Sequence, residues 1–327
     1  GKSTEQRDLW LVKISDRPLS DEKEPEVKYI ANMHGNEIVG RELMVLLIEE
    51  LVTKYKAGDE KIKQLIDNTE IYIMPSMNPD GAAKRRRGNA GYADLNRDFP
   101  DFTTRDDSNV PGNREPETQA VMKWQAKKTF ALSANFHGGA EVVNYPWDTT
   151  GETHPLHNMI KGISEDYAQF VPGMINSTKF PGGITNGYDW YEVNGGMQDW
   201  SYYWHGDLQI TIELSDSKWP NYSEVARYYR ENKKSLINFL KQAHQGAGFY
   251  LSKKSIYRNS DKGQVRITKK TDNALVGIFP YTNGEFYKVL PEGSYQYFIT
   301  TQKNQTFNFD VTIRNSVTRN GRYRELN

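Results

Sequence analysis

The sequence contains no cysteine among its 327 residues. Disulfide frameworks, thiolate zinc sites and cysteine nucleophiles are therefore excluded, and any metal must be held by His, Asp or Glu. Histidine is itself scarce. The six copies are His34, His137, His154, His157, His205 and His244. Any metal site that uses imidazole nitrogens must draw on this short set.

Long apolar runs and net charge are also missing. No run of about 18 apolar residues is present, so we expect no membrane span. The chain has 42 Lys and Arg against 42 Asp and Glu, and a net charge of zero argues against a general nucleic-acid-binding protein. The charges are nevertheless split. Residues 244–327 hold 13 basic and 6 acidic residues, which leaves an acidic larger part that suits cationic substrates.

Hydrophobic periodicity indicates strands that alternate with helices. The expected strands lie within residues 25–35, 70–81, 129–139 and 208–220, and the expected helices within residues 40–58, 114–128 and 221–244. Such alternation predicts an α/β fold with a mixed, mainly parallel sheet and helices on both faces. Ligands of such sheets gather at the carboxyl ends of strands, where "ANMHG" and "ANFHGG" each place a histidine.

The pattern changes after "QGAG" at residues 245–248. Residues 249–327 have no long helical period, but they contain several short alternating runs separated by turn residues. These runs predict a small antiparallel β-sandwich. We therefore expect one domain over residues 1–245 and a second over residues 246–327.

The stretch "NMHGNE" places His34 and Glu37 three residues apart at a predicted strand end. His-x-x-Glu is common by chance, and a polar loop with a helix-capping carboxylate explains it equally well. His137 would complete a set of three protein ligands, the number that catalytic zinc sites use. A strand-terminal histidine bonded to a backbone carbonyl is the alternative for His137. The residues alone leave both interpretations open.

Six stretches together resemble the zinc metallocarboxypeptidases, specifically the regulatory subfamily of carboxypeptidases N, E, M and D. They are "NMHGNEIVGREL", "MNPDG", "DLNRDFPDF", "NFHGG" with "VVNYPWD", "GGITNGYDWYEVNGGMQDWSY" and "ITIELS". The resemblance runs in order from residue 1 to about residue 243, and residues 246–327 resemble the transthyretin-like domain of that subfamily. It also implies that a first helix and part of an edge strand precede "GKSTEQRDLW". Because cysteines near "ELS" are missing, we expect a bacterial-type member.

The resemblance implies a role for each residue of the catalytic centre. His34, Glu37 and His137 would bind one zinc ion, and Asp94 would orient His34. Glu213 would be the general base, for which a sheet-end carboxylate paired with a lysine is the alternative.

Counting back from Asn96 selects Arg87 in "AKRRRGN" as the residue that stabilises the oxyanion. This count leaves Arg85 and Arg86 on the surface, and a slip of one position is the alternative.

The resemblance also implies a substrate site. Asn96, Arg97 and Tyr191 would hold the terminal carboxylate of the substrate, because the planar guanidinium matches two carboxylate oxygens. Asp148 would form the floor of the pocket for the last side chain. A turn residue in "WDTTG" is the alternative for Asp148. Gln198 would provide a polar wall of this pocket, and Asn144 would assist.

The predicted function is therefore a zinc-dependent exopeptidase that removes C-terminal Lys or Arg from peptides or proteins with a free C-terminus. Two alternatives are the same chemistry on peptidoglycan stem peptides or glutamylated tails, and a catalytically inactive peptide-binding module. The resemblance implies a secreted or periplasmic protein, although the first residues show no export signal. Glu152, His154 and His157 have loose metal-ligand spacing, but a helix start explains this stretch more simply.

Overall fold

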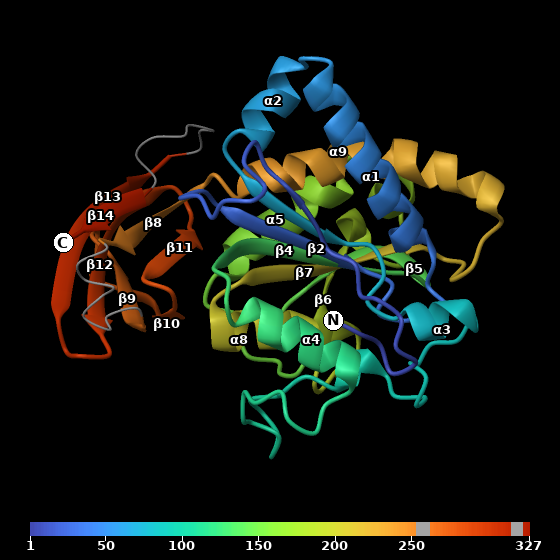
Figure 1. The fold of residues 1–327 in the computed structure, drawn as a ribbon, viewed down its shortest axis with the longest axis horizontal. Coiled ribbons are helices and arrows are strands. Elements are labelled where there is room, and N and C mark those ends of the chain that lie inside the picture. Colours follow the sequence, from blue (N-terminus) through green and yellow to red (C-terminus); the bar gives the residue numbers. More distant parts are fainter. Residues whose placement is uncertain (253–261, 315–322) are drawn as a thin grey trace.

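The computed structural model describes residues 1–252, 262–314 and 323–327, and a seven-stranded sheet lies at its centre (Figure 1). The strand order is β1-β3-β2-β4-β7-β5-β6. The strands are β1 Val12–Ile14, β2 Glu26–Ala31, β3 Glu70–Met74, β4 Phe130–His137, β5 Ala140–Tyr145, β6 Ile184–Asn186 and β7 Leu208–Ser215. Only β1 with β3 and β5 with β7 pair antiparallel among these strands, so the predicted mixed, mainly parallel sheet is confirmed.

Helices cover both faces of this sheet (Figure 1). The longer helices are α1 Val39–Lys56, α2 Glu60–Ile66, α4 Pro116–Gln125, α5 His157–Ala168, α8 Met197–His205 and α9 Val225–Gln242. Shorter turns are α3 Pro79–Ala83, α6 Pro172–Ile175, α7 Gly187–Trp190, η1 Leu95–Arg97, η2 Pro181–Gly183 and η3 Tyr222–Glu224. Every residue of β2, β3, β4 and β7 is buried, and this includes polar residues such as Lys28 and Gln209 as well as the apolar ones.

The last part of the chain forms two smaller sheets that face each other. One has the order β10-β9-β12-β13 and the other β11-β8-β14. Their strands are β8 Gly246–Leu251, β9 Gly263–Lys269, β10 Leu275–Tyr281, β11 Glu285–Val289, β12 Gly293–Thr301, β13 Thr306–Ile313 and β14 Tyr323–Leu326. Phe249 of β8 meets Phe309 of β13, and Phe286 of β11 meets Tyr297 of β12. The predicted small β-sandwich is therefore confirmed.

The sandwich shares one apolar core with the central sheet. Lys288 of β11 is fully buried at this junction, where it donates a hydrogen bond to the carbonyl oxygen of Gly206. Its Nζ lies 4.4 Å from the ring centroids of both Tyr202 and Phe279. The domain boundary near residue 245 stays a prediction. Across the described residues, every helix is too short or too polar to pass through a lipid bilayer.

Candidate active site

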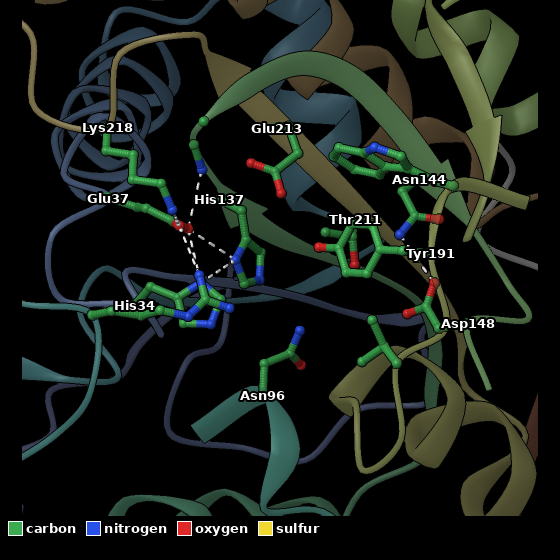
Figure 2. A pocket seen from close by; sticks show the side chains of 15 residues that line it. His34, Glu37, Asn96, His137, Asn144, Asp148, Tyr191, Thr211, Glu213 and Lys218 are labelled. Carbon is green, nitrogen blue, oxygen red and sulfur yellow. Dashed lines mark hydrogen bonds and ion pairs between the residues drawn. The ribbon is translucent and has the colours of Figure 1, made fainter. Parts of the chain in front are cut away.

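Three parallel strands end at one edge of the sheet and bring the predicted catalytic residues together. Strand β4 lies between β2 and β7, and its last residue, His137, is in register with Glu213 of β7. His34 follows three residues after β2, the other neighbour of β4. Residues separated by about a hundred positions in the sequence therefore lie around one cavity, as Figure 2 shows.

The buried side chain of Asn32 makes three hydrogen bonds to the loop that carries His34 and Glu37, and that of Asn78 adds one to Met33. The Asn32 backbone is left-handed, with φ of 56°. Its Nδ2 donates to the carbonyl oxygens of His34, Gly35 and Glu37 at 3.0, 3.2 and 3.2 Å. An asparagine accepts this φ more easily than most residues do, and its amide replaces the hydrogen bonds that the strand no longer supplies.

Gly35 ties this loop to the segment that contains Arg87. Its backbone nitrogen donates to the carbonyl oxygen of Arg87 at 3.1 Å. A Cβ atom at Gly35 would lie 2.2 Å from the carbonyl carbon of Gly81, so a side chain cannot be accommodated without moving backbone. The glycine in "NMHGNE" is therefore required by the close approach of the two segments.

The side chains of His34, Glu37 and His137 converge on one point. Nδ1 of His34 lies 2.9 Å from Oε2 of Glu37, and Nδ1 of His137 lies 3.0 Å from both of these atoms. All three residues are buried. Two imidazole nitrogens and one carboxylate oxygen that face one another in this way match the preferred ligands of zinc. The donor set suits one zinc ion.

The protonation states also favour a cation at this point. Burial lowers the pKa of His137, which keeps its imidazole neutral and able to donate a lone pair. Burial alone would raise the pKa of Glu37, but hydrogen bonds from His137 and His34 hold it well below its usual range. Nε2 of His34 meets Oδ1 of Asp94 at 2.9 Å, which is the predicted contact and the usual way to fix the ring of a metal ligand.

The second oxygen of Glu37 is held by two cations. Nζ of Lys218 lies 2.7 Å from Oε1 of Glu37, and Nη1 of Arg87 lies 3.3 Å from the same atom. Nε of Arg87 also donates to Oδ2 of Asp94 at 2.9 Å. The sequence analysis missed Lys218, because a single lysine in the loop "SDSKWP" carries no pattern that separates it from a surface residue.

Glu213 is buried beside the ligand cluster. Burial, together with the negative charge of Glu37, raises the pKa of Glu213 to about 8. Its Oε2 has no hydrogen-bond partner in the described part of the chain. The alternative of a lysine-paired carboxylate finds no support, since Lys218 makes its ion pair with Glu37 instead. A carboxylate with a free oxygen beside a metal site can accept a proton.

A cavity of about 130 Å³ extends from this cluster to Asp148. Asp148 is only 3% exposed, and its Oδ1 accepts hydrogen bonds from the amides of Asn144 and Gln198, both at 3.0 Å. Oδ2 makes no hydrogen bond within the described residues. Burial raises the pKa of Asp148 to about 6. The enclosed end of the cavity therefore presents one carboxylate oxygen to whatever enters.

Two further residues fix Asp148, and the sequence analysis missed both. Oδ2 of Asp199 accepts the backbone N–H groups of Asp148 and Thr149 at 2.8 and 2.9 Å. Gly187 leaves the space that the Asp148 carboxylate fills, since a Cβ there would lie 1.7 Å from Oδ1. Asp199 directly follows Gln198 in "GGMQDW", but spacing alone gave no reason to choose it.

The three residues predicted to hold a terminal carboxylate differ in their placement. Asn96 and Tyr191 line the cavity, and Oδ1 of Asn96 accepts from the backbone nitrogen of Met197 at 3.0 Å. Arg97 is exposed, and its Nη1 donates to the carbonyl oxygen of Asn96 at 2.8 Å. Burial raises the pKa of both Asp148 and Tyr191, and the positive charge of Arg97 partly opposes both shifts, so Arg97 acts on this end of the cavity from its rim.

His154 and His157, which have loose metal-ligand spacing in the sequence, have other contacts in the structure. His154 packs in the core between the rings of Trp147 and Tyr202, and its Nδ1 accepts from the backbone nitrogen of Leu156 at 3.0 Å. His157 is the first residue of α5, as the helix-start interpretation predicts.

The chain is similar to known proteins over most of its length. The model of the family "Zinc carboxypeptidase" matches residues 1–235. Human carboxypeptidase D is 38% identical over 96% of this chain, which spans 24% of that protein. Mouse carboxypeptidase M is 38% identical over 96% of this chain and 74% of its own length. The human carboxypeptidase N catalytic chain is 36% identical over 96% of this chain and 77% of its own length. This chain thus spans about a quarter of carboxypeptidase D.

Solved structures agree on the fold. The match to the crystal structure of thrombin activatable fibrinolysis inhibitor covers 74% of this chain and 67% of that protein, with a TM-score of 0.65 at 17% identity. The match to a metallo-carboxypeptidase from Pseudomonas aeruginosa covers 73% of this chain and 62% of that protein, with a TM-score of 0.56 at 21% identity. The family model covers most of the chain, and the buried His34, Glu37 and His137 suit its metal. The chain therefore belongs to the zinc carboxypeptidase family.

Proposed function

We propose that this chain hydrolyses the last peptide bond of peptides or proteins that end in Lys or Arg, as a member of the regulatory subfamily. The observation that carries the proposal is the buried Asp148 at the enclosed end of the cavity. A carboxylate that is held by two amide donors and turns its other oxygen to the cavity would pair with a guanidinium or an ammonium group. Similarity to carboxypeptidases D, M and N supports the same subfamily.

The residues of the cavity would divide the reaction between them. His34, Glu37 and His137 would hold a zinc ion, which would supply Lewis-acid chemistry toward the scissile carbonyl and the attacking water. Glu213 would take a proton from that water and later deliver it to the leaving amine. Arg87 would stabilise the negative charge that develops on the carbonyl oxygen. Asn96, Arg97 and Tyr191 would hold the terminal carboxylate, which limits cleavage to the last bond.

Other substrates of the same chemistry fit this cavity less well. A glutamylated tail would place a carboxylate against Asp148, and the two like charges would repel each other in an enclosed site. Stem peptides of peptidoglycan would require a pocket end that is basic or neutral. A catalytically inactive module is also less well supported, because the residues that would carry the reaction line one cavity, namely His34, Glu37, Arg87, His137 and Glu213.

Replacing Asp148 by Ala tests the proposal. The change leaves a substrate cation without its partner in an enclosed site, for which a loss of about 2–5 kcal/mol is typical. kcat/KM for peptides ending in Arg or Lys should therefore fall by about a hundredfold. Slow cleavage of peptides ending in Phe and the zinc content should stay nearly unchanged.

The exposed Asp107 offers a matched control, and Asp107→Ala should behave like the wild-type chain. A chelator should abolish all cleavage, and added zinc should restore it. An equal loss on Arg and Phe substrates would assign Asp148 to the fold, and unchanged cleavage of Arg peptides would place recognition of the cation elsewhere. Either outcome would overturn the proposed specificity.

A further inference from the structure

A second hollow of about 520 Å³ lies outside the catalytic cavity, and the reaction proposed above does not use it. We call it the Trp10–Trp219 groove. Its wall includes Trp10, Arg41, Val45, Pro75, Arg85 and Trp219. Trp10 is 73% exposed and Val45 of α1 is 50% exposed. Large apolar side chains that share an open hollow usually mark an interaction site, and tryptophan and arginine are the residues most enriched at such sites.

Arg85 is placed in this groove by an uncommon backbone conformation. Its φ is 49°, in the left-handed region that residues other than glycine seldom occupy. Its guanidinium carbon lies 4.9 Å from the ring centroid of Trp219. No carboxylate of the described residues forms an ion pair with Arg85. Stacking uses the face of the guanidinium, so its N–H groups stay available for an anion. The arginine that the sequence analysis left on the surface thus has a defined position.

The direction of a bound substrate leads toward this groove. Figure 2 shows Asp148 and Lys218 at opposite ends of the catalytic cavity, with His34, Glu37 and His137 near the Lys218 end. We infer that a peptide whose last side chain meets Asp148 and whose scissile carbonyl meets the ligand cluster continues toward Lys218, at the opposite end of the cavity. Trp219 directly follows Lys218, and Arg85 stands two residues before Arg87. Two residues of the groove are thus close in sequence to Lys218 and Arg87, which line the catalytic cavity.

We propose that the Trp10–Trp219 groove binds the substrate segment that precedes the scissile bond, and that it selects an aromatic residue next to an acidic one. The inference rests on the proposed function and names a further feature of its substrates. The faces of Trp10 and Trp219 and the side chain of Val45 suit an aromatic ring. The charge of Arg85 suits a carboxylate. Asp8, which also lines the groove, is already paired with Lys2 at 2.7 Å.

Peptides that share a C-terminal Arg test this subsite. One is a blocked dipeptide that cannot reach the groove, and the others are decapeptides in which a Trp-Glu pair is moved stepwise upstream through an alanine background. At one position of the pair, kcat/KM should exceed that of the all-alanine decapeptide by about fivefold to tenfold, the scale of one exposed charge contact with added apolar contact. The dipeptide sets the activity of the catalytic cavity alone.

Two variants and a control assign the gain to the groove. Arg85→Asp reverses the charge with a residue that tolerates positive φ, and it should remove the gain for Trp-Glu and create one for Trp-Lys. Trp10→Ala should reduce the gain for both pairs. Arg230→Asp, on the exposed part of α9 and outside the groove, should leave the gain intact. All three variants should cleave the blocked dipeptide within about twofold of the wild-type rate.

The outcomes separate this inference from the proposed function. Cleavage of the dipeptide by a chain that shows no preference among the decapeptides would overturn the groove alone. The proposed role of the groove would also be wrong if the Trp-Glu preference survived in Arg85→Asp, since the preference would then arise elsewhere. It would be wrong as well if Arg85→Asp lowered cleavage of the dipeptide as much as cleavage of the Trp-Glu decapeptide, since Arg85 would then only support Arg87. A wild-type chain that cleaves no peptide ending in Arg would instead refute the proposed function.

Discussion

The side-chain amide of Asn32 stabilises the loop that carries the metal ligands His34 and Glu37. Asn32→Gly keeps the left-handed backbone at φ of 56° and removes three buried hydrogen bonds to the loop that contains His34 and Glu37. At about 1 kcal/mol for each bond, the free energy of unfolding should fall by about 3 kcal/mol. For a chain of this size each kcal/mol lowers Tm by roughly 2–3 °C, so we expect a decrease of about 6–9 °C.

The same change should weaken zinc binding, because the loop holds two of the three ligands. Substitution of groups that orient metal ligands typically lowers affinity by about 10–100-fold. Calorimetry of the metal-free protein gives the change in Tm, and competition with a chelating dye gives the zinc affinity. Asn273→Gly is the matched control, since Asn273 is exposed and has a φ of 58°. If the two variants agreed in Tm and zinc affinity, the role assigned to Asn32 would be wrong.

Three further predictions concern protons. Glu213→Gln keeps the size of the side chain but removes the proton acceptor. We expect kcat to fall by at least about 10²-fold while zinc stays bound. Activity within a few fold of the wild-type rate would exclude Glu213 as the general base. Burial raises the pKa of Asp148 to about 6, so Asp148 gains a proton as the pH is lowered through this value. We expect kcat/KM to decrease more steeply for Arg peptides than for Phe peptides at pH values below about 6. Parallel pH profiles for the two substrates would contradict this prediction. Burial lowers the pKa of Lys288 from 10.5 to about 7, so the unfolded chain binds more protons between these values and stability rises with pH. Lys288→Met should raise Tm most near pH 7 and progressively less toward pH 10, and a constant difference would refute the assignment.

The sequence predicted the central sheet well because its inner strands are buried on both faces. Each of these strands contains several β-branched or aromatic residues, and each long helix between them carries its own periodicity. The histidines could be placed because the carboxyl ends of parallel strands meet at one edge. Strand β5 was not among the predicted strands, and nothing in its sequence "AEVVNY" indicates that it runs antiparallel to β7.

The residues that support the site escaped prediction for a different reason. Lys218 and Asp199 act through contacts between segments that are distant in the sequence, and neither stands at a position that periodicity or a turn preference singles out. The amide of Asn32 was visible only as part of a polar loop. Arg85 was judged from the charge of its run, while its position depends on a backbone angle and on the ring of Trp219.

The order in which the three catalytic strands occur along the chain has a consequence for synthesis. His34 follows β2 and His137 ends β4, whereas Glu213 belongs to β7, which leaves the ribosome last of the three. Domains generally fold as units, and during synthesis the N-terminal domain folds first. A nascent chain that has paired β2 with β4 would already bring the metal ligands together, but it would lack the proton acceptor. The ability to cut peptides would therefore arise only after the sheet is nearly complete, so that partly made molecules stay harmless to their neighbours.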